Sequence, residues 1–178
     1  MEKLVLIKLI LTTPWLIWLS VYDFRKRELP NSLTLGGAAV MAVVALAVNL
    51  NYLLGSLLTG FLVSLFLLLP FFLRAAGAGD VKMLFAAGLT AGPGNTLNLI
   101  LLVSVAGLIL AGIMLLLKRV DPARLKHYLR CFFDFRYDRT EGRKNLPPTD
   151  PESCRVPFGA AIAAGLWCNL LIQLIYLW

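Results

Sequence analysis

The sequence predicts an all-α, polytopic membrane protein with about six transmembrane helices. Of its 178 residues, 59% are hydrophobic, whereas roughly half is usual for a soluble domain. The apolar residues gather in long runs, and runs of about 20 form helices in a bilayer because lipid offers no partner for backbone N–H and C=O groups. No stretch alternates apolar and polar residues as a strand of a membrane barrel does.

Six apolar spans separated by polar turns account for most of the chain. We expect them at residues 3–22, 32–49, 52–73, 80–91, 96–117 and 156–178. The fourth span is short, and it could start inside the membrane near Gly77. The first is expected to be retained rather than removed as a signal peptide, because no small-residue cleavage site follows it. Residues 1–178 are therefore treated as a single transmembrane domain.

The distribution of basic residues predicts the orientation. The connections after the first, third and fifth spans are basic, whereas those after the second and fourth, NLN and AGPGN, carry no charge. Basic connections stay in the cytoplasm, so both termini are expected outside, although Lys3 and Lys8 argue mildly against this. The net charge of +7 then reflects topology and attraction to lipid head groups. No nucleic-acid partner is expected.

The only sizeable polar segment is residues 118–155, expected to be a cytoplasmic loop with a helix that starts at Asp121. The three cysteines, Cys131, Cys154 and Cys168, form no CxxC pair. Their spacing with the single histidine matches no common zinc pattern, and two of them face the reducing cytoplasm. We predict no disulfide, no metal site and no cofactor.

Two carboxylates close to the apolar spans are the candidate catalytic residues. Asp23 ends the first span in WLSVYDFRKRELPN, and Asp80 opens the fourth in GAGDVKML. The predicted topology puts both at the cytoplasmic boundary, where ionisable side chains face the bundle interior or water. The two aspartates could therefore meet.

Paired aspartates have a recognisable chemistry. Two carboxyls a few ångströms apart share one proton, because both cannot comfortably ionise. The ionised member can take a proton from a water that attacks a peptide carbonyl, and the protonated member can protonate the leaving amine. From the residues alone two simpler roles stay open, namely a helix cap for Asp80 and an interfacial ion pair with the neighbouring basic residues for Asp23.

Glycine and proline residues surround both aspartates. Gly77 and Gly79 permit positive φ and close approach of another chain, and an unwound segment there could pair with an extended substrate. In ELPN, Pro30 ends the turn, and Asn31 or Ser32 is expected to cap the second span. These residues would fix the geometry around the two aspartates.

Taken together, DFRKRELPN, GAGDVKML and RVPFGAAIAAG resemble the motifs of the type IV prepilin peptidases, the GxGD family of intramembrane aspartic proteases. The resemblance implies a transmembrane peptidase domain that removes the short basic leader of prepilins or pseudopilins at the cytoplasmic face of the cell membrane. Carried over by position, it implies Asp23 and Asp80 as the catalytic residues. The supporting motif residues are Gly77, Gly79, Lys82, Pro30, Asn31, Pro157 and Gly159.

One departure from the longer members of that family is visible. They carry an N-terminal segment with paired CxxC motifs that bind zinc and accompany methylation, whereas this sequence begins with a membrane span. We therefore expect peptidase activity without methyltransferase activity. The alternatives are a small transporter or proton-relay protein that uses the same aspartates, and a structural subunit of a pilus machine. A relay would need polar groups at mid-membrane depth, and no ionisable residue is expected deep in any span.

Overall fold

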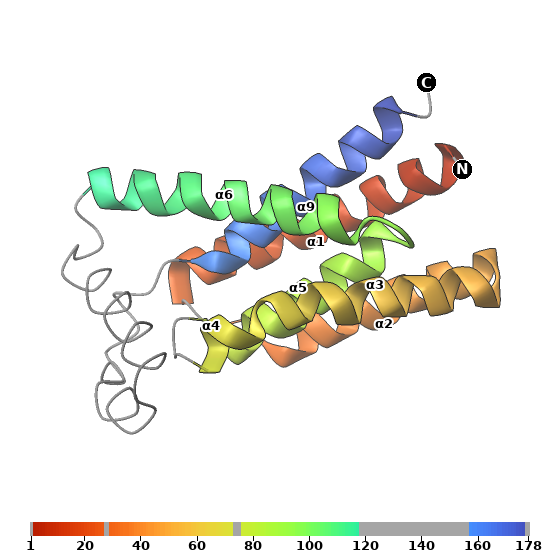
Figure 1. The fold of residues 1–178 in the computed structure, drawn as a ribbon, viewed down its shortest axis with the longest axis horizontal. Helices are drawn as coiled ribbons and strands as arrows, with labels where there is room; N and C mark the ends of the chain where they lie inside the picture. The colour runs from red at the N-terminus through yellow and green to blue at the C-terminus, as the bar shows by residue number, and fades with distance from the viewer. Residues whose placement is uncertain (1, 27–28, 73–75, 118–156, 177–178) are drawn as a thin grey trace, which may run out of the picture.

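A computed structural model describes residues 2–26, 29–72, 76–117 and 157–176. These residues form seven helices (Figure 1), which are α1 (Glu2–Lys26), α2 (Asn31–Val48), α3 (Leu50–Phe66), α4 (Leu68–Phe72), α5 (Ala78–Ala91), α6 (Thr96–Leu116) and α9 (Phe158–Ile175). The all-α prediction is confirmed. The expected loop at 118–155, with its helix from Asp121, lies outside the described residues.

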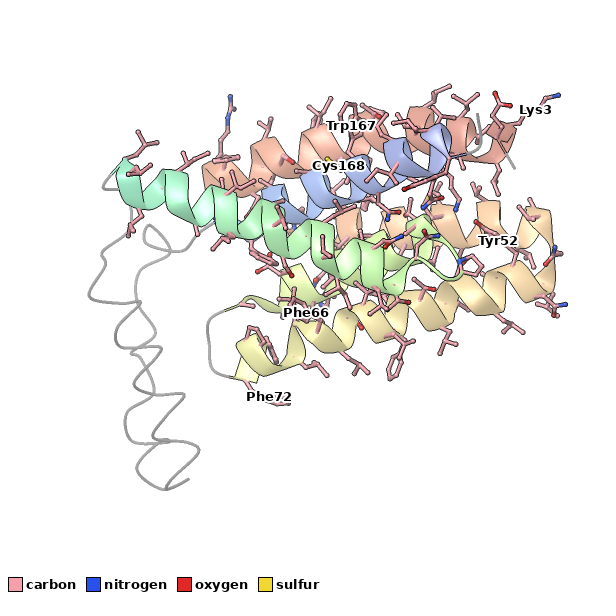
Figure 2. The ribbon with its side chains drawn as sticks, turned by 45° about the horizontal axis from the view of Figure 1, so that its top comes forward. Lys3, Tyr52, Phe66, Phe72, Trp167 and Cys168 are labelled. Atoms are coloured by element: carbon pink, nitrogen blue, oxygen red, sulfur yellow. The ribbon has the colours of Figure 1, made fainter. Side chains whose placement is uncertain are left out.

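Four of the helices, α1, α2, α6 and α9, are long and apolar enough to cross a membrane, and α3 is a shorter apolar helix. Large hydrophobic side chains cover the outer surface; Phe72 of α4, for example, is 71% exposed and projects outward (Figure 2). Such a surface suits lipid, because the same patch on a soluble protein would drive aggregation. The protein is a multi-span membrane protein.

The third expected span, residues 52–73, is divided into α3 and α4. The helix ends at Phe66, and the N–H of Leu67 bonds instead to Ser64 O at 3.1 Å. Pro70 explains the break, since its ring has no N–H to offer Phe66 O, four residues earlier, and clashes with that carbonyl.

The short helix α5 lies at the centre of the bundle. It packs closely against α3, α2 and α9, while α1 packs mainly against α9, which in turn packs on α6. The residues of α5 from Met83 to Ala91 are buried with the exception of Phe85. Its contact with α3 is close enough to require glycine, because a Cβ added to Gly88 would lie 2.7 Å from Gly60 Cα.

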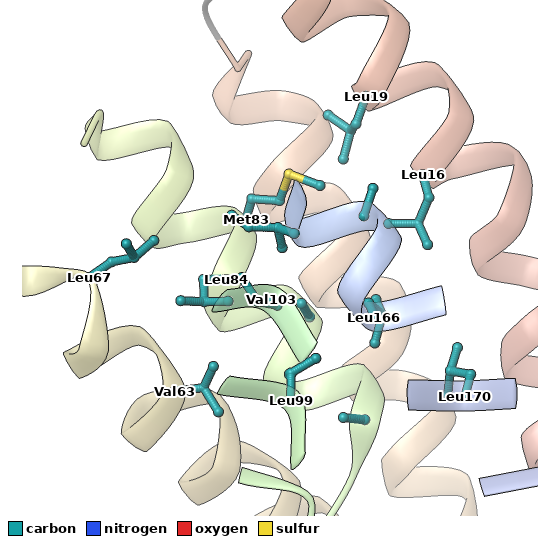
Figure 3. Packing of buried hydrophobic residues seen from close by; sticks show 14 residues of the cluster. Leu16, Leu19, Val63, Leu67, Met83, Leu84, Leu99, Val103, Leu166 and Leu170 are labelled. Atoms are coloured by element: carbon teal, nitrogen blue, oxygen red, sulfur yellow. The ribbon is translucent and has the colours of Figure 1, made fainter. Parts of the chain in front are cut away.

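An apolar core joins these helices (Figure 3). It draws side chains from α1, α3, α5, α6 and α9 and from Leu67 between α3 and α4. The members labelled in Figure 3 are Leu16, Leu19, Val63, Leu67, Met83, Leu84, Leu99, Val103, Leu166 and Leu170. The two termini lie at the same end of the bundle (Figure 1). The last residues of α1 and the first residues of α2, α5 and α9 lie at the opposite end, where the candidate site is found.

Candidate active site

Asp23 lies near the end of α1 and is 4% exposed. Its carboxylate packs against Gly159 in the first turn of α9, where an added Cβ would be 2.8 Å from Asp23 Oδ2 and 3.2 Å from Cγ. Only glycine leaves room for the carboxylate in this position. The positive end of the α9 dipole favours a negative charge there.

The start of α9 is shaped by the third motif. Pro157 is the N-cap residue, with φ −71° and ψ 80°, and Phe158 begins the helix. Proline suits this position because the first N–H groups of a helix have no intrahelical acceptor. Pro157 and Gly159, both predicted as supporting residues, therefore set where α9 begins and how closely Asp23 approaches it.

Asp80 occupies the first turn of α5 and is partly buried. Its Oδ2 accepts a hydrogen bond of 2.9 Å from the N–H of Gly77, the N-cap residue. Asp80 is thus a helix cap, one of the two simpler roles left open by the sequence. This does not exclude catalysis, because a carboxylate has two oxygens and about four acceptor sites.

The two glycines of GAGD differ in what they contribute. Gly79 permits close approach, because an added Cβ would lie 2.9 Å from Leu29 Cβ. Gly77 has φ −84°, and among the described residues the glycines with positive φ are Gly92 and Gly94. Neither Gly77 nor Gly79 uses the positive φ that glycine permits. Because the N–H of Gly77 already donates to Asp80, that group is engaged rather than open to a substrate strand.

Leu29 and Asn31 of the ELPN turn contact the start of α5. Pro30, with φ −67° and ψ 132°, is the N-cap residue of α2, and no side chain caps the helix. The expectation that Asn31 or Ser32 caps this helix is therefore wrong. Asn31 is already inside the first turn, and its Oδ1 accepts a hydrogen bond of 2.8 Å from Lys82 Nζ.

Leu29 brings the three motifs together. It contacts Gly79 at the start of α5, and its Cδ1 would lie 3.2 Å from a Cβ added to Gly159 at the start of α9. Asp23 lies against Gly159, and Asp80 follows Gly79 directly. Residues far apart in the sequence therefore meet at one end of the bundle, where Leu29 lies against both glycines.

Lys8 is a buried ionisable residue that the sequence motifs did not point to. It lies near the start of α1 and is 1% exposed inside the bundle. The signal was its spacing from Asp23, because both lie on one face of α1 with intervals of three and four residues. The buried residues of that face are Val5, Lys8, Thr12, Leu16, Leu19 and Asp23.

With this geometry in place, comparison with known families is decisive. A model of the type IV leader peptidase family matches residues 10–112, more than half of the chain. The chain belongs to the type IV leader peptidase family. The range matched by this leader peptidase model includes Asp23 and Asp80, whereas Pro157 and Gly159 lie beyond it. Searches of curated proteins and of solved structures gave no match.

Metal-ligating side chains do not cluster in the part of the chain that the structure describes. Within residues 2–26, 29–72, 76–117 and 157–176, no three His, Cys, Asp or Glu side chains gather in a way that could hold an ion. His127, Cys131 and Cys154 lie outside these ranges.

Proposed function

We propose that this chain is an intramembrane aspartic endopeptidase that removes the short basic leader of prepilin-like proteins. The observation that supports the proposal is the position of Leu29, which lies against Gly79, the residue before Asp80, and against Gly159, on which Asp23 packs. Family membership supports leader peptides as the class of substrate. The burial of Asp23 against Gly159 supports a role for this carboxylate inside the bundle.

The proposed reaction is hydrolysis of one peptide bond. The ionised aspartate removes a proton from a water molecule while the water oxygen adds to the scissile carbonyl carbon. The protonated aspartate polarises that carbonyl and then protonates the amide nitrogen, so that the C–N bond breaks and a carboxylic acid and an amine leave. Either aspartate can be the base in this scheme, because two adjacent carboxyls that share a proton titrate as a pair.

The proposed place of cleavage is the cytoplasmic boundary of the membrane. Arg25 and Lys26, which end α1, lie at the site end of the bundle and are exposed. Basic residues concentrate on the cytoplasmic side, so this end faces the cytoplasm and both termini face outward. A prepilin leader that precedes an apolar helix would present its cut site at this depth.

The alternative of a proton relay is less well supported. Lys8 is a buried ionisable group, as a relay would require, but it lies toward the opposite end of α1 from Asp23. Apolar core residues, including Leu16, Leu19 and Met83, fill the bundle between the two ends in the described chain. A relay needs an unbroken series of polar groups or water, and this layer interrupts it.

The test is leader cleavage of a prepilin by purified protein, with Asp23→Asn and Asp80→Asn compared with the parent. Each change keeps the size of the side chain and removes the titrating group. Glu2→Gln, which makes the same chemical change at an exposed carboxylate in the first turn of α1, is the matched control. We expect loss of cleavage by at least about 1,000-fold in both aspartate variants and parental rates in the control. Parental cleavage by either folded aspartate variant would refute the mechanism.

A further inference from the structure

Lys8 makes a buried contact that the proposed chemistry does not use. Its Nζ donates hydrogen bonds to Tyr52 OH at 2.8 Å and to Thr90 O at 2.6 Å. These partners belong to α3 and α5, so one side chain of α1 joins three helices. A lysine in such a place is costly unless it is paired and hydrogen-bonded, which indicates a specific role.

The contact lies at the C-terminal end of α5, where the backbone needs partners. With 14 residues, α5 is about 21 Å long at 1.5 Å per residue, whereas the hydrocarbon layer is about 30 Å thick. The last carbonyls of a helix have no intrahelical donors, and Thr90 and Ala91 are 0% and 1% exposed. They therefore require donors from elsewhere in the bundle.

Three side chains supply these donors. Lys8 bonds to Thr90 O, while Ala91 O accepts from Gln173 Nε2 of α9 at 3.0 Å and from Asn95 Nδ2 at 3.1 Å. Lys8 is the charged member of this set, and a positive charge at a helix C-terminus is favoured by the helix dipole. The end of α5 is thus fixed to α1 and α9 by directional bonds.

These bonds matter for the site because α1 carries Asp23 and α5 carries Asp80. The two helices are not among the closely packed pairs, and each packs instead against α9. Apolar contacts are non-directional, whereas a hydrogen bond fixes one atom relative to another. The bond from Lys8 to Thr90 O is a direct and directional link between the helices that hold the two aspartates.

We propose that Lys8 is a positioning residue that sets the height of Asp80 relative to Asp23. Lys8 precedes Asp23 by 15 residues on α1, and Asp80 precedes Thr90 by 10 residues on α5. These separations are about 22 Å and 15 Å along two helices. A shift of α5 at the Lys8 end is therefore carried to Asp80 by a rigid helix. This inference rests on the proposed peptidase function.

The test compares Lys8→Met and Lys8→Gln with Lys3→Met, an exposed lysine five residues earlier on the same helix. Methionine keeps the apolar stem without a donor, whereas glutamine keeps a donor on a side chain one atom shorter. A displacement of about 1 Å can lower a rate about 100-fold. We expect kcat for leader cleavage to fall about 10- to 100-fold in Lys8→Met and less in Lys8→Gln. KM should stay within about twofold of the parent, and Lys3→Met should match the parent.

A second readout does not depend on activity. Lys26 and Ala78 are both exposed. In a background without other cysteines, Lys26→Cys and Ala78→Cys carry spin labels. The labels report the distance between the last residue of α1 and the first residue of α5. We expect this distance to shift or broaden in Lys8→Met and Lys8→Gln and not in Lys3→Met. Lys8→Gln keeps the test decisive if Lys8→Met does not fold.

The outcomes separate this inference from the function on which it rests. A parent that cleaves no leader, with the label distance still dependent on Lys8, would refute the function and leave the link between helices standing. A parent that cleaves, with kcat and label distance unchanged in a folded Lys8 variant, would overturn the positioning role alone. A rise in KM with unchanged kcat would overturn it as well, because it would indicate substrate binding instead.

Discussion

The contact between Asp23 and Gly159 predicts a large effect from the addition of one methyl group. In Gly159→Ala the new Cβ would lie 2.8 Å from Asp23 Oδ2 and 3.2 Å from Leu29 Cδ1. Ordinary contacts are about 3.5 Å or more, so the carboxylate must recede by at least about half an ångström. Leu29 restricts the alternative of moving α9, because it also contacts Gly79 on α5.

The magnitude follows from two competing terms. Alanine stabilises a helix relative to glycine by about 0.5–1 kcal/mol, and overpacking costs about 1–3 kcal/mol. The free energy of unfolding should therefore fall by no more than about 2.5 kcal/mol, and the protein should remain folded. Catalysis is more sensitive, since a misplacement of about 1 Å can cost about 100-fold. We expect kcat for leader cleavage to fall about 10- to 100-fold.

Gly112→Ala is the matched control, because nothing lies within 4 Å of a Cβ added there. It makes the same chemical change in α6, gains the same helix propensity and should keep the parental kcat. The assay is leader cleavage in detergent, with thermal unfolding measured on the same samples. A folded Gly159→Ala variant that cleaves within twofold of the parent would refute the close placement of Asp23 against α9.

Two further predictions concern the contacts of α5. Gly88→Ala should lower the free energy of unfolding by about 1–3 kcal/mol. The added Cβ would lie 2.7 Å from Gly60 Cα, and a backbone atom cannot rotate away as a side chain can. An unchanged midpoint of thermal unfolding would contradict this helix contact. Lys82→Met removes the exposed hydrogen bond to Asn31 and should change the free energy of unfolding by less than about 1 kcal/mol; a loss above about 2 kcal/mol would show that Lys82 holds the ELPN turn more strongly than one exposed bond can.

The fold class was predictable because the bilayer restricts backbone hydrogen bonding. Long apolar runs had to be helices, and short polar turns such as NLN and AGPGN had to separate antiparallel neighbours. The break between α3 and α4 was not anticipated, since the apolar run continues through Pro70 without a polar residue. Hydropathy alone does not register the carbonyl that proline leaves without a donor.

The site was predictable in outline for a related reason. Carboxylates near apolar spans must face the interior, and this placed Asp23 and Asp80 at one end of the bundle. The contacts of Gly159 and Leu29 could not be derived in the same way. In a membrane helix both the lipid-facing and the core-facing sides are apolar, so periodicity does not show which helices face each other.

The shortness of α5 connects the candidate site with the opposite end of the bundle. A helix of 14 residues leaves both of its ends within reach of longer neighbours, and polar groups bond to each end. At the first end, Gly77 and Asp80 form the cap, which places a carboxylate at the same end of the bundle as Asp23. At the other end, the buried carbonyls require donors, which explains a lysine inside an apolar span. A full-length helix would have carried both ends to the membrane surface, where neither Asp80 nor Lys8 would be held in place by the bundle.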